Sequence, residues 1–149
     1  MSKLRLSNSV YVWALVFFLV TTVLRWRLHP DITILFYYVG AIIGLHMLEI
    51  AELIFKAPVS PFRTMLMQLV AIIMGLFVLT SSDSRVGAGV VLFLNWRYFY
   101  LQYSQYLAQH NLTSWLGNIK TIDMVRTEKI YLTLICIALI IQTVLFVLI

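Results

Sequence analysis

Three ionisable residues, His46, Glu49 and Glu52, recur at every third position inside a long apolar stretch of the chain. On an α-helix this spacing places an imidazole and two carboxylates within one arc of the surface. Such groups can bind a metal ion, pass protons along a path or pair with cations. Which of these they do depends on the groups that face them from the rest of the chain.

A single arginine, Arg97, lies within another largely apolar segment. An unpaired charge at the depth of a bilayer is costly, so the charge is paired, neutralised or in contact with water. Counting the helical rise from the ends of the two segments brings Arg97 and Glu49 to similar depths. We therefore predict a contact between Arg97 and Glu49. Glu52 is the alternative partner of Arg97, or it pairs with Lys56 one turn further along the same helix.

Other polar side chains accompany Arg97 in its segment, and we predict that they join a buried charge network or line an ion pathway. The predicted site consists of His46, Glu49, Glu52, Arg97, Asn95, Gln102 and Gln105. A second group of histidines or carboxylates facing His46 is missing from the sequence. We therefore predict no catalytic residues, no metal site and no cofactor, and the one cysteine, Cys136, adds no metal-binding motif.

The composition indicates the surroundings of these residues. Of the 149 residues, 62% are hydrophobic and 11% are charged, and the mean hydropathy is +0.93. Soluble domains carry roughly 25% charged residues, so we predict an all-α integral membrane protein, with residues 1–149 forming one polytopic domain. The basic residues fall singly between apolar segments, a pattern that favours orientation in a bilayer over nucleic-acid binding.

Five apolar segments are predicted to form a bundle of transmembrane helices, since a spanning helix needs about 20 residues. They are Val10–Leu24, Ile32–Phe55, Phe62–Thr80, Val86–Leu107 and Ile130–Ile149. Arg25 and Arg27 would extend the first helix and reach the headgroups. The bundle has four spanning helices if the segment around Arg97 does not fully cross. The short connections predict that successive helices are antiparallel neighbours.

The joints between these segments carry residues that favour helix starts. Asp31, Ser60 and Thr127 are predicted N-caps of the second, third and last helices. The longest connection, residues 109–128, has apolar residues at helical spacing. It is either a helix on the membrane surface near residues 112–120 or an irregular loop packed on the bundle.

The second segment also has a face of small residues, Gly40, Gly44 and Ala51. Small residues four positions apart allow another helix to approach closely. The sequence leaves open whether that helix belongs to the same chain or to another copy.

The distribution of positive charge predicts a cytoplasmic N-terminus and a C-terminus outside. With five spans, most basic residues then lie on the inner side: Lys3, Arg5, Lys56, Arg63, Lys120, Arg126 and Lys129. The outer side holds Arg25, Arg27 and Arg85. The opposite orientation would reverse this bias.

The function predicted from these features is that of a small non-catalytic subunit of a larger membrane protein complex. Its partners would be the lipid bilayer and other membrane proteins or further copies of itself. The alternative is a small homo-oligomeric channel or transporter for ions or protons, with the polar faces of the second and fourth helices lining the pathway. A third interpretation is a membrane-embedded enzyme with a lipid or quinone-like substrate.

Overall fold

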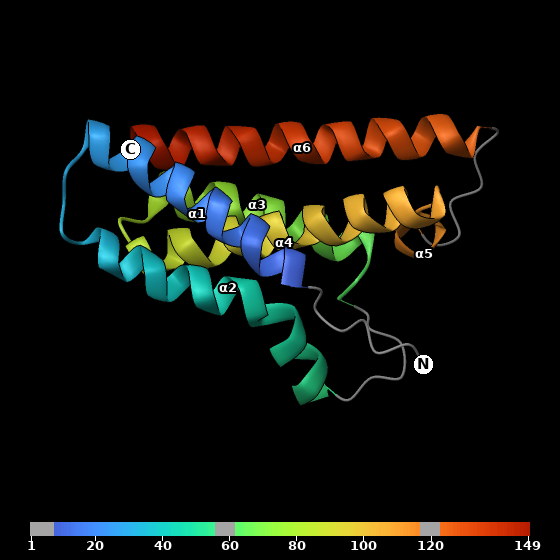
Figure 1. The fold of residues 1–149 in the computed structure, drawn as a ribbon, viewed down its shortest axis with the longest axis horizontal. Coiled ribbons are helices and arrows are strands. Elements are labelled where there is room, and N and C mark those ends of the chain that lie inside the picture. The colour runs from blue at the N-terminus through green and yellow to red at the C-terminus, as the bar shows by residue number, and fades with distance from the viewer. Residues whose placement is uncertain (1–7, 56–61, 117–122) are drawn as a thin grey trace.

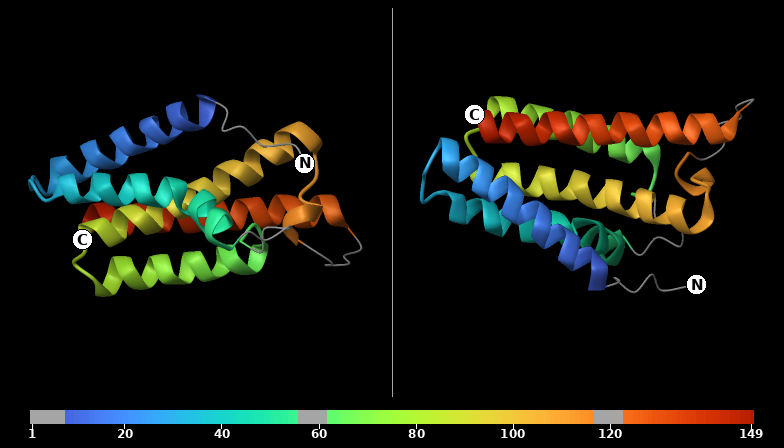
Figure 2. Two further views of the ribbon diagram at one scale, coloured as in Figure 1. Left: turned by 90° about the horizontal axis from the view of Figure 1, so that it is seen from below. Right: turned by 45° about the horizontal axis from the view of Figure 1, so that its top comes forward.

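The computed structural model describes residues 8–55, 62–116 and 123–149, and within these ranges all regular structure is helical. The helices are α1 (Asn8–Leu28), α2 (Ile34–Phe55), α3 (Met65–Ser81), α4 (Arg85–Gln109), α5 (Thr113–Leu116) and α6 (Met124–Leu148). Helices α1, α3 and α6 run toward the end of the bundle that holds Ile149, and α2 and α4 run toward the end that holds Asp123 (Figures 1 and 2). These are called the Ile149 end and the Asp123 end below.

Three of the described helices are long and apolar enough to cross a membrane: Ser9–Leu28, Ile34–Phe55 and Met124–Leu148. Helix α3 is apolar but has only 17 residues. Helix α4 has 25 residues and a more polar sequence. The predicted helical membrane protein is therefore supported by three apolar helices.

Helix α4 is the centre of the bundle. Its residues 95–98 are all buried, although consecutive residues on a helix point about 100° apart and so face every direction. Helices α2, α3 and α6 all pack against α4, and α1 touches it. The most polar long helix can therefore lie inside an apolar protein, because other helices pack around it.

The closest helix contact joins α2 and α4, which run in the same direction. A Cβ atom added at Gly40 would lie 2.0 Å from the carbonyl oxygen of Val86, and one added at Gly44 would lie 2.3 Å from that of Val90. Gly89 meets α2 in the same way, with 2.4 Å to the Tyr37 carbonyl oxygen. The small face of α2 therefore packs within the chain.

Two expectations about packing need correction. Ala51, the third residue predicted for the small face, is only half-buried, because the buried stripe of α2 ends at Leu48. Successive helices alternate in direction as predicted, but the main neighbour of α2 is α4 rather than α1 or α3. The glycines decide this, since they let α4 approach α2 more closely than larger side chains would.

The observed helix starts differ from the three predicted caps. Helix α2 begins at Ile34, three residues after Asp31. Helix α3 begins after Thr64, whose side chain accepts a hydrogen bond from the Met67 N–H; Ser60 lies outside the described residues. Helix α6 is capped by Asp123 rather than Thr127, so it begins six residues before the apolar segment. A carboxylate at the earlier position satisfies a free N–H of the first turn and lengthens the helix.

The connection after α4 contains the short helix α5, and residues 117–120 of the predicted surface helix lie outside the described residues. The apolar residues Leu112, Trp115 and Leu116 are buried against the bundle. The N–H of Leu112 donates a 2.8 Å hydrogen bond to the Glu128 carboxylate at the start of α6. The described part of this connection therefore packs on the bundle and contains the short helix α5.

Candidate functional site

The predicted contact between Arg97 and Glu49 is present. Nη2 of Arg97 on α4 donates to Oε1 of Glu49 on α2 over 2.6 Å. Only 3% of the arginine side chain is exposed, against 30% of the glutamate side chain. The pair thus connects the centre of the bundle to a partly open position on α2.

The hydrogen bonding of this pair is incomplete. Nε and Nη1 of Arg97 and Oε2 of Glu49 are buried and have no partner among the described residues. Unpaired polar atoms in an apolar interior are costly. The pair therefore has two donor nitrogens and one acceptor oxygen left for other molecules or water.

The second glutamate of α2 does not contact Arg97. Glu52 accepts from Nε and Nη2 of Arg63, at 2.6 and 3.2 Å, in a two-bond ion pair. Arg63 lies just before α3, so this pair bridges the ends of α2 and α3. Lys56, the other predicted partner of Glu52, lies outside the described residues. The pairing of Glu52 with Arg63 was not predicted from the sequence, because it depends on where the next helix begins.

His46 stands apart from the ion pair. Its half-buried ring lies 6.0 Å from the ring of Tyr11 on α1, with the planes tilted by 40°. No hydrogen bond from His46 to a described residue is found. The predicted group of one imidazole and two carboxylates therefore does not form one site. Each of its members contacts a different residue, on a different part of the chain.

Asn95 and Gln102 belong to a separate cluster between α3, α4 and α6, and not to the network around Arg97. Asn95 donates to Oε1 of Gln142 over 3.0 Å and to the carbonyl oxygen of Ala71 over 3.2 Å. The amide nitrogen of Gln102 donates to Oε1 of Gln68 and to the Tyr131 hydroxyl. These two hydrogen-bonded groups, Asn95 with Gln142 and Gln102 with Gln68 and Tyr131, are together called the amide cluster.

The reason for this separation is helical geometry. Asn95 and Gln102 are seven residues apart and share one face of α4, whereas Arg97 lies about 200° from Asn95, on the side of α2. Gly75 on α3 supplies the space, because a Cβ there would lie 2.6 Å from the Gln142 amide nitrogen and 2.9 Å from that of Asn95. Polar side chains of one helix thus serve two different interfaces.

Gln105, the last predicted member of the network, fixes the connection after α4. Its amide nitrogen donates to the hydroxyl of Ser114 over 2.9 Å, and its oxygen accepts from the indole nitrogen of Trp115 over 2.9 Å. It has no described contact with Arg97. Its role here is to hold α5 against the bundle.

We expect Gln102→Leu to lower the free energy of unfolding by about 1–3 kcal/mol, the typical cost of leaving buried polar partners unsatisfied. Gln102 is fully buried and bonded to two other helices. The measurement is detergent-denaturant unfolding followed by circular dichroism. Gln109→Leu, at the exposed end of α4, is the control. Equal stability of the two variants would contradict a stabilising role for the amide cluster.

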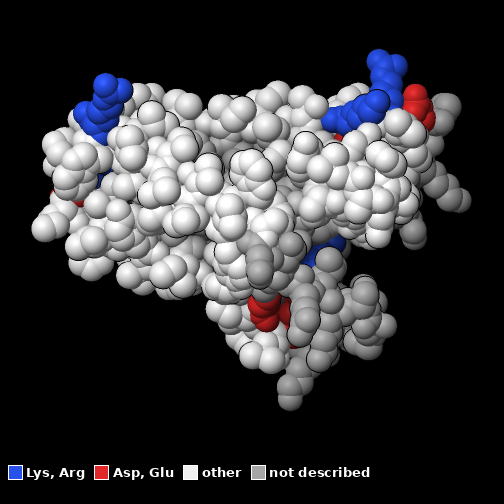
Figure 3. Space-filling view, in the orientation of Figure 1, with Lys and Arg blue, Asp and Glu red and all other residues white. Residues whose placement is uncertain are grey.

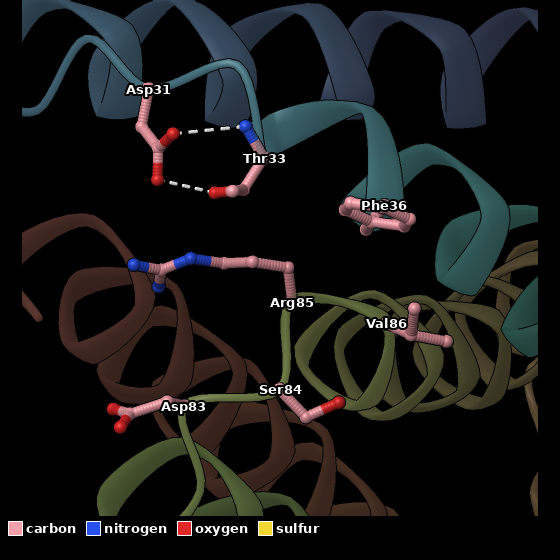
Figure 4. A pocket seen from close by; sticks show the side chains of 7 residues that line it. All are labelled: Asp31, Thr33, Phe36, Asp83, Ser84, Arg85 and Val86. Atoms are coloured by element: carbon pink, nitrogen blue, oxygen red, sulfur yellow. Dashed lines mark hydrogen bonds between the residues drawn. The ribbon is translucent and has the colours of Figure 1, made fainter.

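An open pocket of about 400 Å³ lies at the Ile149 end. Figure 4 shows Arg85 reaching from the start of α4 below the Asp31–Thr33 turn, with Asp83 on the other side of the guanidinium. Among the described residues, these charged groups form no ion pair within 4.0 Å. Asp31 instead accepts from the N–H of Thr33 over 3.0 Å and from its hydroxyl.

The hydroxyl and the N–H of Thr33 lower the pKa of the Asp31 carboxyl below its ordinary value, with smaller contributions from Arg85 and Arg25. Asp31 therefore stabilises the fold above its unfolded pKa of about 3.9. That contribution is lost as the pH falls through the lower folded-state pKa.

We expect Thr33→Val to raise the pKa of Asp31, because valine keeps the shape of threonine and removes the hydroxyl donor. The pKa is measured from the carboxyl carbon shift of Asp31 by NMR in detergent. An unchanged pKa in the variant would mean that the hydroxyl does not stabilise the charged carboxylate.

Arg25 corrects the expectation that both arginines of the first helix reach the headgroups. Its side chain is 4% exposed. It donates through Nη1 to the carbonyl oxygen of Phe146, and its guanidinium lies 5.0 Å from the centre of that ring. Arg27, two residues later, is exposed as predicted. Arg25 satisfies a carbonyl in the last turn of α6, where a cation also suits the helix dipole.

Several residues that shape these sites were not predicted for these roles: Arg25, Arg63, Gln68, Gly75, Tyr131 and Gln142. Of these, Gln68 and Gln142 carried a sequence signal, since each is a lone amide within an apolar segment. Arg63, Arg25 and Tyr131 carried none, because their roles depend on helix ends and on packing between distant segments.

Within the described residues, no group of three or more His, Cys, Asp and Glu side chains is placed to hold a metal ion. Cys136 is a free, half-buried thiol on α6. In comparisons with known proteins, no family model, curated protein or solved structure matches the chain.

Proposed function

We propose that the chain is a multi-pass membrane protein in which all five long helices cross the bilayer, with the N-terminus cytoplasmic and the C-terminus outside. Helix α4 needs little apolar surface of its own over residues 88–98, because α2, α3 and α6 pack around it there. On the face seen in Figure 3, charged atoms gather at the two ends of the bundle and in one recess, with an uncharged surface between. That distribution suits a hydrocarbon layer around the middle of the bundle.

The proposed role is that of a non-catalytic subunit of a larger membrane assembly. The observation that carries it is the pairing of the deep polar residues of α4: Asn95, Arg97 and Gln102 each bond a residue on α2, α3 or α6. These polar contacts therefore hold the helices together inside the bundle. The outer faces of α1, α2, α3 and α6 expose large apolar side chains, which suit contacts with lipid or with other membrane helices.

The test is extraction from native membranes in a mild detergent, followed by gel filtration and native mass spectrometry. A subunit should co-purify with partner chains at a fixed stoichiometry that persists through gel filtration. Recovery of a clean homo-oligomer or of the monomer alone would contradict the proposed role.

A path for protons or ions is the second candidate, and the unpaired atoms of Arg97 and Glu49 favour it. Ionisable residues inside membrane proteins often mark such paths. In liposomes containing only this protein, a channel would give ion or proton flux that changes in Glu49→Gln. The absence of flux from correctly folded protein would exclude this candidate.

A further inference from the structure

The end of α2 is an arm attached to the bundle mainly by charge. Leu48 is the last buried residue of α2, and the turns after it run away from the bundle body (Figure 1). Two ion pairs hold these turns, Glu49 with Arg97 and Glu52 with Arg63. The arm is therefore defined as residues 49–55, and it contributes little packing of its own.

A recess lies beside the arm. Figure 3 shows positively charged atoms in the notch between the bundle and the projecting end of α2, and negatively charged atoms on that projecting end, on a face that is otherwise uncharged away from the bundle ends. Glu49 is 30% exposed, and the buried guanidinium of Arg97 lies directly behind it. A ligand approaching along the arm would meet Glu49 first, and the unpaired nitrogens of Arg97 behind it are buried.

The unpaired groups indicate the chemistry of that ligand. A guanidinium has five N–H donors, and Arg97 uses Nη2 for Glu49 while Nε and Nη1 have no described partner. An oxyanion carries two or three strong acceptor oxygens and forms charge-assisted hydrogen bonds with arginine. The two unpaired donor nitrogens outnumber the one unpaired acceptor, Oε2 of Glu49, and a carboxylate or phosphate group would supply further acceptors.

The depth of Arg97 suits a lipid headgroup. On α4, Arg97 lies between Asn95 and Gln102, which donate to Ala71 and Gln68 of α3. Arg97 is thus level with the second turn of α3, roughly 5–10 Å from the first residue of that helix. In the proposed membrane arrangement this is near the inner boundary of the hydrocarbon layer, within reach of an anionic headgroup drawn slightly inward.

The surface around the recess suits acyl chains. Large apolar side chains are exposed on the arm: Ile50, Leu53, Ile54 and Phe55. A soluble anion gains nothing from this surface, whereas an amphiphile would bury its chains on it. We propose that the recess beside the arm binds a lipid through its phosphate or carboxylate oxyanion, with Arg97 as the anion contact and Glu49 as a competing carboxylate. This inference rests on the proposed membrane crossing and is independent of the subunit role.

The test is native mass spectrometry of the full chain in dodecyl maltoside with dioleoyl phosphatidate added. Dioleoylglycerol, which has the same chains without phosphate, is the lipid control. We expect selective retention of phosphatidate and roughly tenfold weaker retention by Arg97→Gln, which corresponds to about 1.4 kcal/mol. Retention of both lipids alike would overturn the proposal. Displacement of phosphatidate by inorganic phosphate would overturn the assignment of the oxyanion to a lipid.

Glu49→Gln, measured on the fraction that elutes as folded protein in gel filtration, tests the competition, because it removes the competing carboxylate and leaves the arginine in place. It should retain phosphatidate several times more strongly than the wild type, even if Arg97→Gln fails to fold. Arg126→Gln, an exposed arginine at the same end of the bundle, should leave retention unchanged. Weaker or unchanged retention by Glu49→Gln, or a loss in Arg126→Gln as large as in Arg97→Gln, would overturn the proposal.

Discussion

Gly40→Leu is expected to prevent α2 and α4 from packing, and Gly40→Ala is expected to destabilise the fold strongly. Even the single methyl group of alanine would stand 2.0 Å from the carbonyl oxygen of Val86. Backbone atoms cannot rotate out of the way, so the two helices must separate by an ångström or more. Overpacking typically costs about 1–3 kcal/mol and occasionally more, and this clash with backbone belongs at or above the upper end.

The measurement is the denaturation midpoint of purified protein, followed by circular dichroism at several protein concentrations. Gly87→Ala is the matched control, since its new methyl would meet only side chains, with the Val78 methyl at 3.0 Å. The loss of stability should not depend on protein concentration, because the contact between α2 and α4 lies within one chain. A midpoint for Gly40→Ala equal to that of Gly87→Ala, or a loss that disappears at high concentration, would contradict the packing described.

Breaking the Arg97–Glu49 pair is expected to produce the second large effect. Glu49→Gln leaves the buried charge of Arg97 without its counterion. Arg97→Gln leaves the carboxylate of Glu49 without its counterion. Removal of one partner from a buried pair costs about 3–5 kcal/mol, with the lower value expected here because Glu49 is 30% exposed. The double variant has no unpaired charge, so its cost should be smaller than the sum of the single costs.

The four proteins of this cycle are compared by denaturant unfolding in one detergent. Glu52→Gln is the control, because both members of the Glu52–Arg63 pair are about as exposed as Glu49, and such pairs contribute up to about 1 kcal/mol. Strictly additive costs of Glu49→Gln and Arg97→Gln would mean that the two residues do not interact in the folded protein.

The sequence was sufficient to predict helices and one long-range contact. The cost of an isolated charge in an apolar segment requires a partner, and helical rise brought Glu49 to the depth of Arg97. The glycine pair likewise predicted a close helix approach. Both inferences depend on the spacing of residues within one segment and on a strong physical penalty. Each can therefore be made without knowing how the segments pack.

The rest depended on how α4 is rotated within the bundle. Asn95 and Arg97 are two residues apart and face different neighbours, so one polar segment divides between α2 and the α3–α6 side. Which side receives which residue is set by packing at Gly40, Gly44 and Gly75. Pairings such as Glu52 with Arg63 also required helix ends that the apolar pattern does not locate.

Helix α4 is proposed to cross the bilayer enclosed by its neighbours. This crossing is tested most directly by single cysteines at the exposed positions Ser82 and Asn111, which flank α4, in a Cys136→Ser background. A membrane-impermeant maleimide is applied to right-side-out and inverted vesicles. We expect labelling of Ser82→Cys from outside and of Asn111→Cys from inside. Labelling of both positions from the same side would contradict it.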